Sequence, residues 1–231
     1  MNLFEENEEV TLKIVLKQLK NYWDDVDTNI IFQAIPTVLF NLQKGFSEVY
    51  CKYFYDEKLC KSSLSPIISS QWGIFLYRLS HQIFIDGKGK VPKEADQVYY
   101  LNKILHSNDW FYAVDLPIHF IVEHPLGSVL GRATYGDYFC ILQGTTVGGN
   151  RRNGKIYYPQ IGNNVMMFAN SSIIGDTTIG DNVILSAGTQ IVNDNVPSNS
   201  IVFGQSPNLV IKNKTEEDIK KYSQHIWRWE I

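Results

Sequence analysis

The chain of 231 residues lacks several features that define large classes of proteins. It contains no run of about 18 apolar residues, so we expect no transmembrane helix. Its opening segment, MNLFEENEEV, is acidic and has no apolar core, which argues against a secretory signal. The formal net charge is −3 and the pI is about 6.0. These values do not indicate a basic surface that coats phosphates, so we expect no nucleic-acid partner.

Cysteine is also scarce. Cys51, Cys60 and Cys140 are odd in number and have no CxxC spacing of the kind that holds a metal ion. The sequence therefore predicts reduced thiols, no metal site and a cytoplasmic location.

Residues 1–112 carry helical patterns. Apolar residues recur among charged ones in a way that predicts helices over residues 5–23, 32–55, 69–85 and 95–105. Pro36 is expected to begin the second of these helices or to kink it, because proline lacks a backbone donor. Thr215, followed by three acidic residues, predicts the N-cap of a C-terminal helix that reaches about Trp229.

The second half has a different period. Aliphatic residues recur every six positions at Ile161, Met167, Ile173, Ile179, Leu185 and Ile191, and Val129, Tyr135, Ile141 and Val147 hold the same spacing upstream. A helix repeats at 3.6 residues and a strand at 2, so a period of six indicates a solenoid. Each hexad forms one face of a triangular coil, and its apolar residue points inward. A β-sandwich with coincidental spacing is the alternative.

One interruption divides this repeat. The interval from Val147 to Ile161 exceeds a multiple of six by two positions, and the glycine-rich segment 148–155 lies within it. We expect this segment to leave the coil as an extruded loop, where a regular scaffold places its specificity.

Several motifs resemble the hexapeptide-repeat acyltransferases and, within them, the serine acetyltransferases, over about residues 68–210. They are Tyr77-Arg78-x-x-His81, Val114-Asp115-Leu116, Glu123-His124, Ile141-Leu142-Gln143 and Thr146-Val147-Gly148-Gly149. The resemblance implies an α+β protein with an α-helical N-terminal domain (1–112), a left-handed parallel β-helix (113–210) and a C-terminal helix or tail (211–231). It also implies acetyl-CoA as the acyl donor, and a homotrimer or a dimer of trimers.

The family position of His124 makes it the candidate general base, since imidazole titrates near neutral pH. Asp115 is the candidate carboxylate partner of that ring, and Glu123 the candidate for the acceptor side. His119 is a weaker reserve for the base.

The donor site is predicted from small residues. A backbone N–H in the segment Gly148-Gly149-Asn150 is expected to stabilise the oxyanion, because glycine allows close approach of the main chain. Family positions that line the acetyl-CoA groove fall on Gly149, Asn150, Ala169 and Ala187, and Gly148 and Ser186 are further candidates for binding acetyl-CoA.

The acceptor site departs from the family. Serine acetyltransferases carry Arg-His where this chain has Tyr157-Tyr158, which removes a guanidinium suited to a carboxylate. Arg151 and Arg152 of the loop are candidates to replace it. The paired tyrosines favour transfer of the acetyl group to a hydroxyl or amine of a small or carbohydrate-linked acceptor, as in polysaccharide biosynthesis. The alternatives are a serine O-acetyltransferase of cysteine biosynthesis, in which Ile231 docks into a partner enzyme, and a non-catalytic solenoid scaffold.

Overall fold

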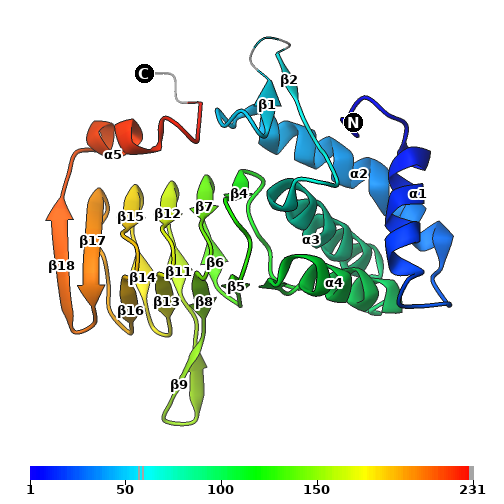
Figure 1. The fold of residues 1–231 in the computed structure, drawn as a ribbon. Helices are drawn as coiled ribbons and strands as arrows, with labels where there is room; N and C mark the ends of the chain where they lie inside the picture. The colour runs from blue at the N-terminus through cyan, green and yellow to red at the C-terminus, as the bar shows by residue number, and fades with distance from the viewer. Residues whose placement is uncertain (57, 59, 229–231) are drawn as a thin grey trace. The chain divides into compact units, whose positions relative to one another are not determined.

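The computed structural model describes residues 1–56, 58 and 60–228 of the chain (Figure 1). Ile231, the residue expected to dock into a partner, lies outside them. The chain forms two compact units, residues 1–107 with 111–113 and residues 108–110 with 114–231. Among the helices that the structure describes, none is both long and apolar enough to cross a bilayer.

The first unit is helical. It contains α1 (Glu8–Leu19), α2 (Thr28–Ser47), α3 (Ser69–Asp86) and α4 (Lys93–His106), with a short antiparallel pair, β1 (Tyr55–Asp56) and β2 (Lys61–Ser62). Apolar faces of the helices form its core, including Val15, Leu19, Ile31, Val38, Leu42, Phe75, Leu79, Val98 and Leu101.

Pro36 lies inside α2, so it does not begin the helix, and the alternative that it kinks the helix stays a prediction. The helix begins at Thr28 because the carboxylate of Asp27 caps it, accepting hydrogen bonds from the N–H groups of Asn29 and Ile30. A local cap therefore decided where the helix begins.

The second unit is a three-sided parallel β-solenoid. Face A contains β3 (Asp109–Trp110), β5 (Val129–Leu130), β8 (Thr146–Gly148), β13 (Ser172–Ile174) and β16 (Gln190–Val192). Face B contains β4 (Phe120–Val122), β7 (Phe139–Ile141), β12 (Val165–Met167), β15 (Val183–Leu185) and β17 (Ser200–Gln205). Face C contains β6 (Thr134–Tyr135), β11 (Gln160–Ile161) and β14 (Thr178–Ile179). The chain runs from face B to A to C, so we name the three corners the BA, AC and CB edges.

The register confirms the solenoid that the hexads predict. Ile161 pairs with Ile179, Met167 with Leu185 and Ile173 with Ile191, so each residue precedes its partner by three hexads, which make one turn. The six aliphatic residues of this run are at most 3% exposed, because they fill the inside of the coil.

The upstream hexads follow the pattern less closely. Val129 is 38% exposed, so its predicted inward position is wrong. Leu130 takes the inward position and pairs with Val147 on the next coil. The interval from Leu130 to Val147 is one residue shorter than three hexads. The BA edge between β4 and β5 is two residues longer than the BA edge between β7 and β8 in the next coil. The longer corner shifts the register of β5 against β8.

The C-terminal end closes the solenoid. Residues 200–202 of β17 pair with β15 on face B, whereas Gln205 pairs with Gln190 on face A, so one strand spans two faces. β18 (Asn208–Asn213) then pairs antiparallel with β17. The last helix, α5 (Glu216–Ser223), begins at a capping box between Thr215 and Asp218, as predicted, but ends before residue 229. Trp229 lies outside the described residues.

Candidate functional site

His124 lies on the BA edge, directly after β4 and its neighbour Glu123. Its backbone is left-handed, with φ of 59°, and its side chain is exposed. Within the part of the chain that the structure describes, the imidazole makes no hydrogen bond or ion pair. An exposed imidazole at a strained corner is available to an external molecule rather than committed to holding the coil.

Three of the predicted groove residues lie on the same edge in later coils. The N–H of Gly188 donates to the carbonyl of Ala169, which places Ala169 one coil from Ala187. Ser186 precedes Ala187, and its N–H donates to the carbonyl of Val202. The structure thus brings Ala169, Ser186 and Ala187 onto the edge that begins with His124.

The two carboxylates predicted to assist His124 are placed differently. Glu123 is half-buried beside His124, and its N–H donates to the carbonyl of Ile141. Asp115 is exposed and lies before β4, whereas His124 lies after it. No hydrogen bond joins Asp115 to His124, since the imidazole has no partner among the described residues, and both roles stay predictions.

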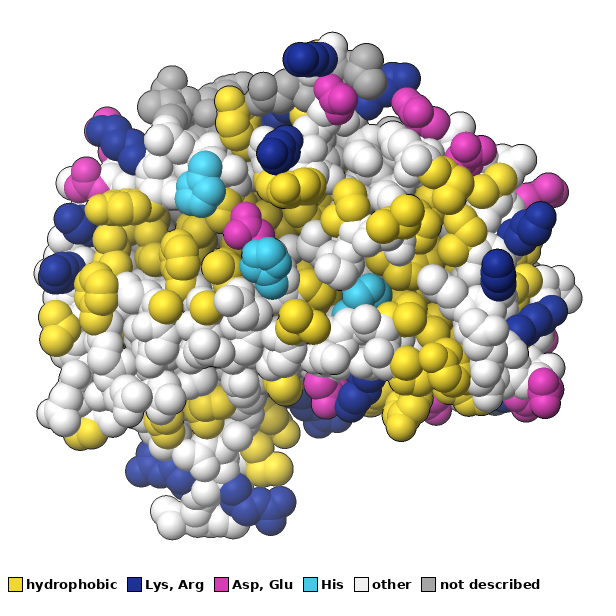
Figure 2. Space-filling model, viewed as in Figure 1, with side chains coloured by type: hydrophobic (Ala, Val, Ile, Leu, Met, Phe, Trp, Pro, Cys, Tyr) yellow, Lys and Arg dark blue, Asp and Glu magenta, His cyan; other side chains and the backbone are white. Residues whose placement is uncertain are grey.

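The extruded segment leaves the solenoid at the AC edge as an antiparallel hairpin. β9 (Asn150–Arg152) pairs with β10 (Lys155–Tyr157) across Asn153 and Gly154, whose φ values are 49° and 77°. Two successive positive φ angles define the tight turn that Asn-Gly favours, so this dipeptide was the overlooked signal for a hairpin rather than an irregular loop. Arg151 and Arg152 are exposed, and Figure 2 shows Lys and Arg side chains on this projection.

Gly149 is required by a neighbouring ring. A Cβ at this position would lie 2.8 Å from the Tyr158 ring and 2.9 Å from Ile156, whereas a Cβ at Gly148 would approach nothing closer than 3.8 Å. Tyr158 therefore packs against the base of the hairpin, and Tyr157 pairs with Asn150 across it. The predicted donor residues 148–150 and the predicted acceptor residues 151, 152, 157 and 158 form one cluster.

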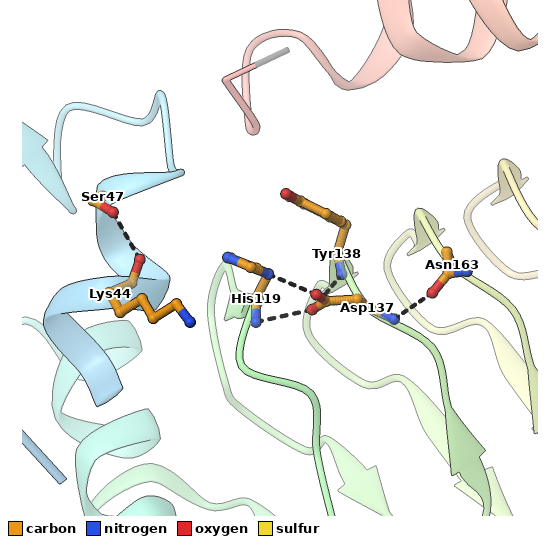
Figure 3. A network of polar contacts seen from close by, with 6 residues as sticks. All are labelled: Lys44, Ser47, His119, Asp137, Tyr138 and Asn163. Carbon is orange, nitrogen blue, oxygen red and sulfur yellow. Dashed lines mark hydrogen bonds and ion pairs between the residues drawn. The ribbon is translucent and has the colours of Figure 1, made fainter. Parts of the chain in front are cut away.

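A second imidazole occupies the CB edge (Figure 3). Nδ1 of His119 lies 2.7 Å from the Asp137 carboxylate, which requires the ring proton on Nδ1. The N–H groups of His119 and Tyr138 both donate to Oδ1 of Asp137, at 3.1 and 3.0 Å. The ring of His119 stacks on Tyr138 at 4.5 Å, and its side chain is only 12% exposed.

This network is one end of a ladder along the CB edge. The N–H of Asp137 donates to Asn163, that of Asn163 to Asp181, and that of Asp181 to Ser198. Each side chain satisfies a backbone donor of the preceding coil, so the ladder holds the corner and fixes the His119 ring. His119 precedes Asp137 by three hexads, one coil, and this spacing is the sequence signal that would have paired the two side chains.

Within one chain the predicted site is divided. His124 precedes β5 on the BA edge, and the hairpin follows β8 on the AC edge. Since β5 and β8 are neighbouring strands of face A, the width of that face separates His124 from the hairpin. The described residues contain no group of three or more His, Cys, Asp or Glu side chains that would hold a metal ion.

Comparisons with known proteins agree with this architecture. The family described as bacterial transferase hexapeptide (six repeats) matches residues 158–193. The serine acetyltransferase of Staphylococcus xylosus is 36% identical over 146 residues, which cover 61% of this chain and 65% of that protein. The serine acetyltransferase of Synechococcus elongatus is 28% identical over 104 residues, so the match spans 41% of that relative's length and 45% of this chain.

The crystal structure of Neisseria gonorrhoeae serine acetyltransferase superimposes with a TM-score of 0.68 at 24% identity, covering 92% of this chain and 81% of that one. The structure of that enzyme in complex with serine gives a TM-score of 0.63 at 26% identity, covering 84% of this chain and 80% of that one. The match over residues 158–193 identifies hexapeptide repeats in the solenoid, and the fold is that of the serine acetyltransferase structures. The sequence is similar to those of serine acetyltransferases.

Proposed function

We propose that the protein transfers an acetyl group from acetyl-CoA to the hydroxyl of L-serine. One observation carries the proposal: His124 is exposed, without a protein partner among the described residues, at the start of an edge lined by Ala169, Ser186 and Ala187. The similarity to serine acetyltransferases favours serine over the carbohydrate-linked acceptor expected from the tyrosine pair, and nothing in the comparisons supports polysaccharide biosynthesis.

In this mechanism His124 accepts the proton of the serine hydroxyl as its oxygen attacks the thioester carbonyl. The new C–O bond creates a tetrahedral oxyanion, which a backbone N–H of the segment 148–150 stabilises. The C–S bond then breaks, and the departing CoA thiolate takes the proton back from the imidazolium. Glu123 binds the acceptor side, and Asp115 supports the charged imidazole.

Serine presents a carboxylate, and the chain must bind it without the Arg-His pair of the family. Arg151 and Arg152 are exposed on the hairpin, and a guanidinium makes two parallel hydrogen bonds to a carboxylate. Tyr157 and Tyr158 lie at the base of the same hairpin, where Tyr157 pairs with Asn150 and the Tyr158 ring packs on Gly149. We therefore assign acceptor binding to the hairpin.

The division of the site within one chain supports a homotrimer. A hairpin that projects from the AC edge is placed to reach the BA edge of a neighbouring chain, so that His124 and the hairpin residues of two subunits complete each site. A mixture of His124→Ala and Tyr158→Ala chains, unfolded and refolded together, should then regain activity that neither variant has alone. Failure of the mixture to exceed the two parent variants contradicts the shared site.

CoA release with L-serine as sole acceptor, compared with a panel of sugars and nucleotide-sugars, tests the reaction. We expect turnover with L-serine and a loss of about 100- to 10,000-fold in His124→Ala, while sedimentation shows an unchanged oligomer. Equal turnover in this variant contradicts the role of His124. A preference for a sugar contradicts L-serine as the acceptor. If calorimetry shows no binding of acetyl-CoA, the alternative of a non-catalytic solenoid scaffold is supported.

A further inference from the structure

A pocket of about 300 Å³ lies within the helical unit and is lined by Trp23, Asp96, Gln97 and Tyr100. Trp23 belongs to the segment 20–27, which joins α1 to α2, and the other three residues lie within two turns of α4. A volume of this size is at the small end of the range for ligand sites, so the pocket suits a ligand of a few heavy atoms.

Two of the lining residues are aromatic. The ring centroids of Trp23 and Tyr100 lie 6.3 Å apart, and the two ring planes are inclined at 80°. Trp23 is half-buried, whereas Tyr100 is 55% exposed, so the Tyr100 ring is accessible to a ligand. The face of an aromatic ring attracts a cation that lies within about 6 Å of its centroid. The two rings therefore favour a positively charged ligand over a neutral one.

Asp96 supplies a negative charge beside these rings. Its Oδ1 accepts a hydrogen bond of 2.8 Å from the hydroxyl of Tyr112, and within the described part of the chain its carboxylate forms no ion pair. Burial, and then the hydrogen bond to Asp96, raise the pKa of Tyr112 to about 12. The phenol therefore keeps its proton at neutral pH and donates it, which leaves the charge of Asp96 without a cation.

Gln97 adds an acceptor that the fold leaves unused. The side chain is 6% exposed, and its Nε2 donates to Oδ1 of Asp25 at 3.4 Å. Its Oε1 is buried and has no hydrogen-bond partner among the residues that the structure describes. Buried acceptors without a donor are uncommon and destabilising. Since Gln97 lines the pocket, a ligand that enters there with an N–H group can satisfy this oxygen.

The neighbouring charges narrow the class of cation. Lys93 does not neutralise Asp96, because its Nζ lies 2.6 Å from Oδ2 of Asp25. The joining segment also carries the exposed acids Asp24 and Asp27, so a carboxylate on the ligand would be repelled. A quaternary ammonium group has no N–H to donate to Asp96 or Gln97. A primary ammonium group on a short apolar chain meets all of these conditions.

We propose that this pocket binds a small aliphatic primary amine, with its ammonium group held by Asp96, Gln97 and the Tyr100 ring. The inference does not depend on the proposed function, because every residue that carries it belongs to the helical unit. It assigns a ligand site to a unit for which the hexapeptide repeats predict no role.

Titration of the full chain with butylammonium chloride at constant ionic strength, followed by saturation-transfer NMR, tests the proposal. We expect saturable binding with a Kd on the order of 1 mM, since the ligand is small. Butanol lacks the charge, tetramethylammonium lacks the N–H groups and glycine carries a carboxylate, so all three should bind more weakly. Absence of saturable butylammonium binding overturns the site, and equal binding of butanol, tetramethylammonium or glycine overturns the class of ligand.

Matched variants locate the binding. Asp96→Asn removes the charge but keeps an oxygen for the Tyr112 hydroxyl, so it should weaken butylammonium binding about 10- to 100-fold. Tyr100→Leu, at an exposed position, should weaken it about 2- to 5-fold. Asp24→Asn removes the same charge from an exposed residue that does not line the pocket, and it should bind as the wild type does. Equal affinities of Asp96→Asn and Asp24→Asn overturn the assignment.

Sedimentation separates a free amine from the lysine side chain of a second copy. We expect the same oligomer for the wild type, for Asp96→Asn and for the wild type with butylammonium. If the variant and the added amine both dissociate the oligomer, the pocket holds a lysine of a neighbouring chain and the proposal of a small-molecule site is overturned.

Discussion

Nδ1 of His119 lies 2.7 Å from Oδ2 of Asp137, one coil further along the CB edge. This carboxylate also accepts two backbone N–H groups, from His119 and Tyr138. The contact orients an imidazole, but the ring is stacked on Tyr138 and mostly buried, whereas His124 is exposed on another edge. The histidine with more contacts thus belongs to the corner ladder, whereas the side chain of His124 is accessible to an external molecule.

Asp137→Ala should lower the free energy of unfolding by about 1–3 kcal/mol, because the donors that Asp137 satisfies lose their acceptor. Urea denaturation measures the change. Asp176→Ala is the control, since Asp176 is another corner aspartate, exposed where Asp137 is half-buried, and its carboxylate has no partner among the described residues. Equal losses in the two variants would contradict the ladder.

Gly149→Ala should displace the hairpin, whereas Gly148→Ala should not. The added methyl group would lie 2.8 Å from the Tyr158 ring in the first case and 3.8 Å from Ile174 in the second. Trypsin cleaves after Arg151, Arg152 and Lys155, so the initial rate of cleavage in this hairpin reports its position. We expect faster cleavage in Gly149→Ala only, and equal rates in both variants would disprove the packing.

Asn182 combines a left-handed backbone, with φ of 56°, and a side-chain ladder to Asn164 and Asn199. Asn182→Gly keeps the backbone but loses the two hydrogen bonds, at about 0.5–1.5 kcal/mol each. Asn182→Ala should cost about 1 kcal/mol more, because alanine also strains the left-handed conformation. Thermal unfolding ranks the wild type, Asn182→Gly and Asn182→Ala. If Asn182→Gly were less stable than Asn182→Ala, the separation into a hydrogen-bond cost and a backbone cost would be refuted.

Stability should fall in mild acid because of His106. Burial lowers the pKa of this histidine from 6.5 to about 4, and its Nδ1 lies 2.8 Å from Oδ1 of Asn102. Above pH 6.5 the ring is neutral in both folded and unfolded chains, so its contribution is complete. As the pH falls toward 4 the unfolded chain takes the proton first, and about 3 kcal/mol of stability is lost.

The variant His106→Gln should remove this pH dependence. Its free energy of unfolding, measured by urea denaturation between pH 4 and 7, should vary less than that of the wild type. His225→Gln, at an exposed position, is the control and should follow the wild type. A His106→Gln profile as steep as the wild-type profile would contradict the assignment.

The sequence predicted the fold best where the burial of a residue depends only on its position within one coil. The residues from Ile161 to Ile191 at six-residue spacing are buried because each faces the same interior. Val129 broke the pattern because the preceding corner is two positions longer, a property of the turn rather than of the hexad. The pairing of β17 with β18 was missed, since its residues carry no hexad signal.

The site was predictable only in part. The exposed His124 and the small residues of the BA edge follow from family positions, and the structure places them along one edge. The packing of Tyr158 on Gly149 depends on a close approach across the hairpin, which spacing alone does not reveal. A pocket of about 410 Å³ that Ile184, Ile201, Tyr222 and His225 help to line depends on where α5 lies, and the sequence pattern of α5 describes only its own turns.

The hairpin leaves the coil without disturbing its register. Ile141 pairs with Met167 although the hairpin lies between them in the sequence, just as Met167 pairs with Leu185 where no hairpin intervenes. The additional residues are therefore absorbed wholly outside the stacked interior. Under the proposed function, substitution or lengthening between Asn150 and Tyr157 would change the choice of acceptor while every buried layer keeps its partner, so selectivity could evolve on an unchanged frame.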